Sequence, residues 1–113
     1  MTCLVLDAYL ECAAWADCHP DSHISCDASF SDDFLAVAKK DVNDFLEALE
    51  ASGIDYDEWS YEQIGHDFWL TRNGHGAGFW DRDLPFGDDL SQLAEAFGPC
   101  ELYEGDDGLI YSL

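Results

Sequence analysis

The sequence contains very few positively charged residues. Four Lys and Arg stand against 25 Asp and Glu, which gives a formal net charge of −21. Without a basic patch the chain cannot neutralise phosphate groups, so its composition excludes direct binding to nucleic acid or to an anionic membrane surface. Repulsion between so many like charges opposes compaction, and we do not expect the acidity to serve the fold. We therefore expect any binding partner to be basic.

The sequence also lacks a basic N-terminal segment and a long apolar run. Its first residues, MTCLVLDAYLEC, reach Asp7 and Glu11 without any Lys or Arg, and no apolar run approaches the length of a membrane span. We expect neither a signal peptide nor a transmembrane segment. The protein is therefore expected to be cytoplasmic. Five cysteines, an odd number without a secretion signal, are expected to be reduced thiols.

Apolar residues are nevertheless plentiful. The chain has 113 residues, of which 48% are hydrophobic and 14% aromatic. This is enough to bury one core and too little for two. We expect a single compact α+β domain spanning residues 1–113.

The clearest helical pattern lies at residues 32–51. Apolar residues recur there at steps of three and four, at Leu35, Ala38, Val42, Phe45, Leu46 and Leu49. Ser31 suits the N-cap position, Asp32 and Asp33 suit the positive end of the helix dipole, and Gly53 stands just past the end. The pattern predicts a helix with one buried stripe.

Three further helices are predicted. Residues 2–16 carry apolar side chains at helical spacing. Ser60 and Gln63 have the spacing of a capping box and predict a short helix after residue 60. Gly87 or Asp88 begins another helix, which Gly98-Pro99 ends.

Two turn signals predict hairpins. In GHDFWLTRNGHGAGFWDRD, residues 65–83, Asn73-Gly74 separates the aromatic runs at residues 68–70 and 79–80, and Asp107-Gly108 divides the end of the chain. The order hairpin, helix, hairpin predicts a small antiparallel sheet of about four strands, packed against the N-terminal helices.

The first predicted hairpin also holds both arginines. We expect Arg72 and Arg82 to pair with neighbouring acids, namely Asp67, Asp81 or Asp83. Trp69 and Trp80 are expected to be core residues; the alternative is that they are cross-strand partners.

Three strings in this chain resemble a family of small acidic proteins that is widespread in bacteriophages, prophages and mobile elements. They are DFWLTRNGHGAGFWDR at residues 67–82, LYEGDDGLIY at residues 102–111 and YLECAAW at residues 9–15. The resemblance covers residues 32–113 in the order of elements, while the loop at residues 18–26 departs from it. Members mostly lack an assigned activity, so the resemblance implies an origin in mobile DNA more than a chemistry. In charge, such proteins resemble anti-restriction and anti-CRISPR inhibitors of host defence.

The acidic residues on the long helix and on the connector after it form the expected partner-binding surface. They are Asp41, Asp44, Glu47, Glu50, Asp55, Asp57, Glu58 and Glu62. We expect their carboxylates to stand in for DNA phosphates on a basic nucleic-acid-binding protein of a host defence complex. This function requires neither a cofactor nor catalysis, and it leaves a homodimer open. The alternative is a salt-adapted host in which acidity only keeps the protein soluble.

Two sets of residues could bind a metal. His66, His75 and Asp81 could hold a divalent ion in a small enzyme, and Cys12, Cys18, His23 and Cys26 supply four zinc ligands in number. Neither set has the spacing of a recognised metal motif. An exposed turn histidine and scattered reduced cysteines are the commoner interpretations, so we expect no cofactor.

Overall fold

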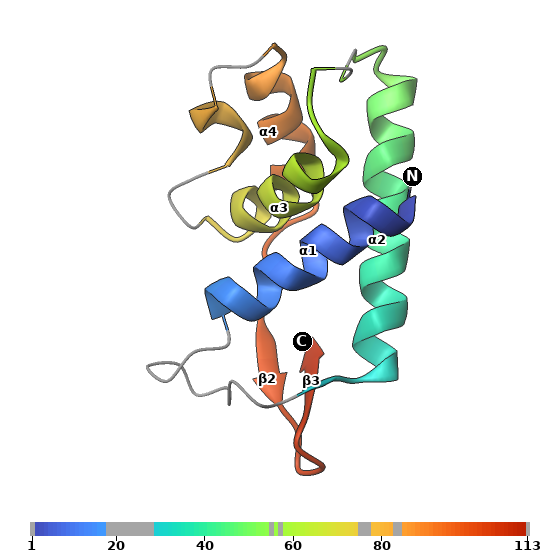
Figure 1. The fold of residues 1–113 in the computed structure, drawn as a ribbon, viewed down its shortest axis with the longest axis vertical. Helices are drawn as coiled ribbons and strands as arrows, with labels where there is room; N and C mark the ends of the chain where they lie inside the picture. The colour runs from blue at the N-terminus through green and yellow to red at the C-terminus, as the bar shows by residue number, and fades with distance from the viewer. Residues whose placement is uncertain are drawn as a thin grey trace.

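The computed structural model describes residues 2–17, 29–54, 56, 58–74, 78–82 and 85–112. In chain order its elements are α1 (Thr2–Asp17), β1 (Ser29–Phe30), α2 (Asp32–Ala51), α3 (Tyr61–Arg72), the 3-10 helix η1 (Phe79–Asp81), α4 (Gly87–Glu95), β2 (Leu102–Glu104) and β3 (Leu109–Ser112). Helix α1 packs mainly on α3 and also contacts α2, α4 lies at one end of the molecule, and the small sheet lies at the other (Figure 1). The predicted α+β class is confirmed.

Helix α2 runs along the long axis of the molecule and forms at the predicted bounds (Figure 1). Ser31 caps it as expected, because its Oγ accepts a hydrogen bond from the Phe34 N–H at 3.1 Å. The buried stripe comprises Phe34, Ala38, Val42, Phe45, Leu46 and Leu49. Phe34 takes the place of the predicted Leu35, which is only partly buried.

Helix α1 crosses α3 at close range. The crossing is possible because α3 has Gly65 there: a Cβ at this position would overlap the carbonyl oxygen of Val5. Tyr9 of α1 lies between Phe68 and Trp69 of α3, with ring centroids 5.2 Å from each. The predicted N-terminal helix is confirmed.

The predicted hairpin at residues 65–83 is wrong. Residues 68–70 continue α3, which ends at Arg72, and residues 79–81 form η1. Asn73 is the C-cap of α3, and Gly74 has a φ of 66°. Asn-Gly allows the positive φ of a hairpin turn, but the same backbone conformation ends a helix. Asn73-Gly74 therefore correctly predicts where the preceding element ends. The predicted strands before and after it are helical instead.

Two expectations near this break are also corrected. Trp69 is fully buried, whereas Trp80 is 49% exposed, so the two tryptophans are not cross-strand partners. At the start of α3, Ser60 Oγ accepts from the Gln63 N–H at 3.1 Å, as a capping box requires. The Gln63 side chain does not reach back to complete the box; it donates to Asp67 Oδ2 at 2.7 Å instead.

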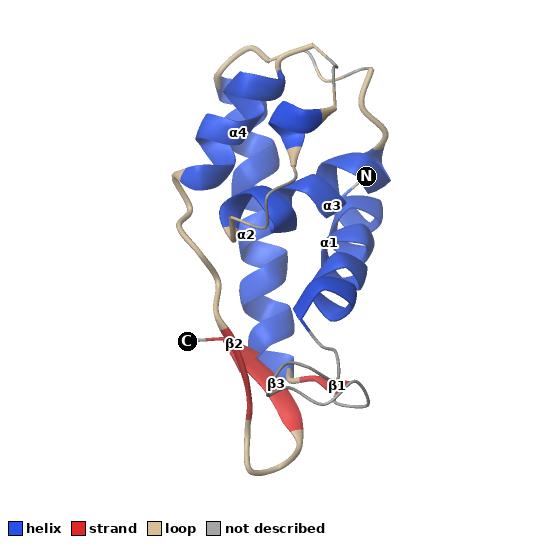
Figure 2. Ribbon diagram, turned by 90° about the vertical axis from the view of Figure 1, so that its left-hand side faces the viewer, coloured by secondary structure: helices blue, strands red, loops and turns tan. Residues whose placement is uncertain are grey.

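The sheet has three strands in the order β1-β3-β2 among the described residues (Figure 2). Strands β2 and β3 form the predicted hairpin around Asp107-Gly108. The third strand comes from Ser29–Phe30 and pairs with β3 in parallel, with Ser29 opposite Leu109. The predicted four-stranded antiparallel sheet is therefore wrong, since one of its two hairpins is helical.

Helix α4 begins at Gly87 and buries Leu90 and Ala94. Its predicted stop is confirmed, because Gly98 has a φ of 74° just past the helix. No helix within the described ranges is long and apolar enough to cross a membrane.

Candidate functional site

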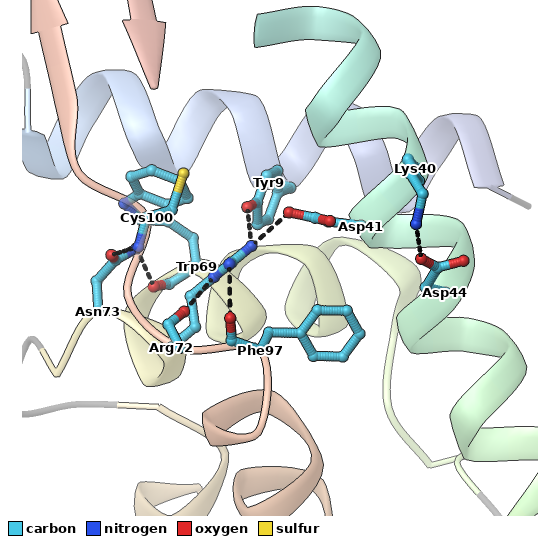
Figure 3. Close-up of polar contacts among 10 residues, drawn as sticks. Tyr9, Lys40, Asp41, Asp44, Trp69, Arg72, Asn73, Phe97 and Cys100 are labelled. Carbon is cyan, nitrogen blue, oxygen red and sulfur yellow. Dashed lines mark hydrogen bonds and ion pairs between the residues drawn. The ribbon is translucent and has the colours of Figure 1, made fainter. Parts of the chain in front are cut away.

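Arg72 lies inside the molecule, where it joins three helices. Its Nη1 is 2.8 Å from Asp41 Oδ2 on α2 and donates to the Tyr9 hydroxyl of α1 at 3.0 Å. Its Nε donates to the Gly98 carbonyl at 2.9 Å, and its Nη2 donates to the Phe97 carbonyl at 3.3 Å. Figure 3 shows these groups converging on the guanidinium. The sequence did not predict the partner, since Asp41 is 31 residues away.

The surroundings of Arg72 hold its charge in place. Its guanidinium carbon lies 5.5 Å from the ring centroid of Phe68 and 5.7 Å from that of Phe97. Burial alone would lower the pKa of Arg72, but the nearby Tyr9 and Asp41 raise it. Burial raises the pKa of the Tyr9 hydroxyl well above its usual range, although Arg72 opposes this shift. The cluster is therefore a charged brace that joins α1, α2 and α3.

Arg82 pairs with Asp67, as predicted. Its Nη2 donates to Oδ1 at 2.7 Å and its Nε donates to Oδ2 at 3.0 Å, so the fully buried carboxylate accepts a bidentate pair of hydrogen bonds. Gln63 donates to the same carboxylate. The hydrogen bond to Asp67 raises the pKa of Arg82, which stays charged.

These two pairs set the charge of the surface. Each arginine is paired with one carboxylate. In the formal charge count of the sequence, only Lys39 and Lys40 then remain to balance the other 23 of the 25 acidic residues. The two lysines are neighbours on α2, and Lys40 Nζ lies 2.7 Å from Asp44 Oδ2. Among the acidic side chains whose burial is described, all are exposed except Asp41, Asp44 and Asp67.

The predicted partner-binding residues divide into groups. Glu47 and Glu50 are exposed on the second half of α2, Glu58 is exposed in the connector, and Glu62 is exposed on the first turn of α3. Asp44 is partly exposed and engages Lys40. The remaining two, Asp55 and Asp57, lie outside the described residues.

Asp41 does not belong to an outward-facing row. It pairs with Arg72, and its side chain is only 20% exposed. Positions three residues apart drift around a helix by about 60° per step, because a turn takes 3.6 residues. From Asp41 to Glu50 the drift amounts to about half a turn, so the two point to opposite sides. Asp41 therefore does not share the outward-facing side of α2 with Glu50, and its place on the partner-binding surface stays a prediction.

The end of α2 carries acids where a helix favours bases. Its last turn contains Glu50 and no basic residue, and Glu47 stands one turn before. Carboxylates there face the negative end of the helix dipole, and acids three residues apart repel each other. Asp32 and Asp33 at the opposite end are favourably placed.

An open pocket of about 350 Å³ lies between α1 and α3. Its lining residues are Ala8, Glu11, Ser60, Glu62, Gln63, His66 and Arg82. Trp15 of α1 is not a lining residue, but its ring centroid lies 6.0 Å from that of His66, which is, and Trp15 is 72% exposed. Sequence reasoning assigned no role to Trp15. The signal was present, since Glu11 and Trp15 are four residues apart and so share one side of the predicted helix.

The metal hypotheses gain no ligand cluster. No group of three His, Cys, Asp or Glu in the described part of the chain could hold a metal ion. His66 and Asp81 are described, but His75 is not. Of the cysteine set, Cys12 is buried in the core, while Cys18, His23 and Cys26 lie outside the described residues.

No protein-family model, curated protein or solved structure matches this chain. A function is therefore inferred from the charge, shape and contacts of the chain itself. The resemblance to small acidic phage proteins stays a prediction.

Proposed function

We propose that the protein is an acidic inhibitor from a phage or mobile element. In this proposal it occupies the nucleic-acid-binding surface of a basic protein in a host defence complex, of the kind that anti-CRISPR or anti-restriction proteins target. Surface carboxylates take the place of phosphates. The protein acts by binding and needs no catalytic step.

The observation that carries the proposal is the density of uncompensated charge along the molecule. The chain is 43 Å long on its longest axis and has a net charge of −21. Duplex DNA carries one charge per about 1.7 Å of axis, so a segment of that length has about 25 charges. The two totals are close. Internal pairing of both arginines supports the comparison, because it keeps those cations from interrupting the negative surface.

The acids at the end of α2 favour the same function. Glu47 and Glu50 destabilise the helix that carries them. The unfavourable interaction with the helix dipole is worth roughly 0.3–1 kcal/mol, and each repulsive pair is worth roughly 0.2–0.5 kcal/mol. Residues that lower stability yet stay exposed are typical of a binding surface. A negative field of this size speeds encounter with a basic channel and weakens with salt.

The test is capture from a bacterial lysate at 50 mM salt on the immobilised protein, followed by elution with duplex DNA. We expect a basic protein that is bound at low salt and released by DNA and by 0.5 M salt. The matched bait carries Glu47→Gln and Glu50→Gln and should retain less of it. Captured proteins that DNA fails to displace would contradict the proposal.

Salt adaptation is the second candidate, because exposed acids occur on every described helix rather than on one face. It predicts a different response to salt. A protein adapted to a saline cell should unfold in dilute buffer and refold in molar potassium chloride. An inhibitor of the proposed kind should stay folded in both.

A further inference from the structure

We infer that the pocket between α1 and α3 receives an arginine side chain of the basic partner, with Trp15 as its stacking surface. The inference rests on the proposed function and adds a localised contact to a diffuse electrostatic one. It identifies where short-range affinity would arise on a surface whose charge mainly guides approach.

Trp15 is the most exposed large hydrophobic side chain of the described residues, at 72%. Its ring lies beside the His66 ring, whose plane is at 34° to its own, and most of its surface is open to solvent. Tryptophan is the aromatic residue that attracts a cation most strongly, and Trp and Arg are the residues most enriched at binding hot spots. An exposed indole beside a pocket is therefore suited to a guanidinium.

The charge of the pocket favours a cation. Glu11 and Glu62 line it from opposite elements, α1 and α3. Arg82 also lines it, but Asp67 neutralises this arginine through contacts of 2.7 and 3.0 Å. With histidine counted as neutral, these four groups sum to a charge of −2. An acidic ligand would be repelled there.

Arginine suits this site better than lysine. Its planar guanidinium can stack on an indole while it donates two parallel hydrogen bonds to one carboxylate, and an ammonium cannot do both. Glu11 is four residues before Trp15 on α1, so a carboxylate and an indole lie on the same side of the helix. That arrangement matches the flat face and the N–H edge of a guanidinium group.

A second copy of the chain cannot supply the occupant. Its arginines, Arg72 and Arg82, are both engaged within the fold. Only Lys39 and Lys40 remain as cations, and both copies are strongly negative. The occupant we infer is therefore an arginine from a different, basic protein.

The test is a titration of the ¹⁵N-labelled protein with acetylated, amidated tetra-arginine at low salt, followed through the tryptophan indole N–H signals. We expect the Trp15 signal to shift most and tetralysine to bind at least threefold more weakly. Trp15→Ala, and the pair Glu11→Gln with Glu62→Gln, should each weaken tetra-arginine binding at least fivefold. Trp80→Ala is the matched control, since Trp80 is also an exposed tryptophan, and it should change binding less than twofold.

Three results would overturn the inference: an unshifted Trp15 signal, unchanged affinity in Trp15→Ala, or an equal loss in Trp80→Ala. Thermal denaturation shows whether each variant is folded. A different result would contradict the proposed function, namely captured partners that neither DNA nor 0.5 M salt releases. Tetra-arginine that binds without involving Trp15 would refute the pocket and leave the acidic surface intact.

Discussion

Neutralising Glu47 and Glu50 should make the protein more stable and a weaker binder at the same time. The double substitution Glu47→Gln, Glu50→Gln removes two repulsive pairs, since Asp44, Glu47 and Glu50 follow one another at three-residue steps. Each pair is unfavourable by about 0.2–0.5 kcal/mol. Relief of the carboxylate from the negative end of the α2 dipole adds about 0.3–1 kcal/mol. The expected gain is about 0.7–2 kcal/mol at low ionic strength.

For a domain of this size, the gain corresponds to a rise in Tm of about 3–8 °C. Thermal denaturation followed by circular dichroism measures it, at low salt and again at 0.5 M salt, where screening should reduce it. Affinity for the captured partner should fall, mainly through slower association. The control is Glu95→Gln: Glu95 is the last residue of α4 and is not one of the predicted partner-binding residues, so the change relieves a different helix end. It should stabilise the protein without loss of binding.

The opposite signs of the two effects make the reasoning refutable. Higher stability with unchanged affinity would show that the acids of α2 do not face the partner. A fall in Tm would show that Glu47 and Glu50 make favourable contacts, and the argument from unfavourable placement would then fail.

Three further predictions concern the fold. Arg72→Met should lower the free energy of unfolding by about 3 kcal/mol in a urea titration, because it leaves Asp41 and two carbonyls without their cation; a loss below 1 kcal/mol would contradict the brace. Gly65→Ala should cost about 1–3 kcal/mol through overlap with α1, whereas an unchanged Tm would show that the helices can separate freely. The hydrogen bond to Asp107 raises the pKa of Tyr111 to about 12 from 10.0. This bond stabilises the folded protein below pH 10, and the stabilisation is lost as pH rises through 12. Asp107→Asn should therefore return the pKa of Tyr111, followed by ¹³C NMR, toward 10. An unchanged pKa in this variant would exclude the bond as the cause of the shift.

The parts of the fold that depend on local pattern could be predicted from the sequence. Helix α2 has a complete set of signals, from the Ser31 cap to the apolar stripe, and it forms at the predicted bounds. The Asp107-Gly108 hairpin is equally local. Strand β1 could not be predicted, because two residues carry no periodicity and the strand exists only through pairing with β3.

The hairpin error has a physical cause. Asn73-Gly74 marks a reversal of the chain, and the backbone conformation of Gly74 serves a turn and a helix end alike. What decides between them is burial on the α3 face, where Gly65 meets α1 and Arg72 meets Asp41. Those contacts join residues far apart in the sequence. The same limit applied to the site, since Asp41 was assigned to the surface from its spacing alone.

Arg72 is buried, and Arg82 pairs with the buried Asp67. The contacts that stabilise the fold are therefore distinct from the exposed carboxylates that give the surface its charge. The contacts that hold the helices together involve groups shielded from solvent, whereas the exposed carboxylates take little part in them. Salt in the medium therefore acts mainly on the exposed carboxylates, whereas the buried ion pairs are screened much less. Under the proposed function, substitutions among the exposed acids should change partner binding while the contacts of Arg72 and Arg82 stay unchanged.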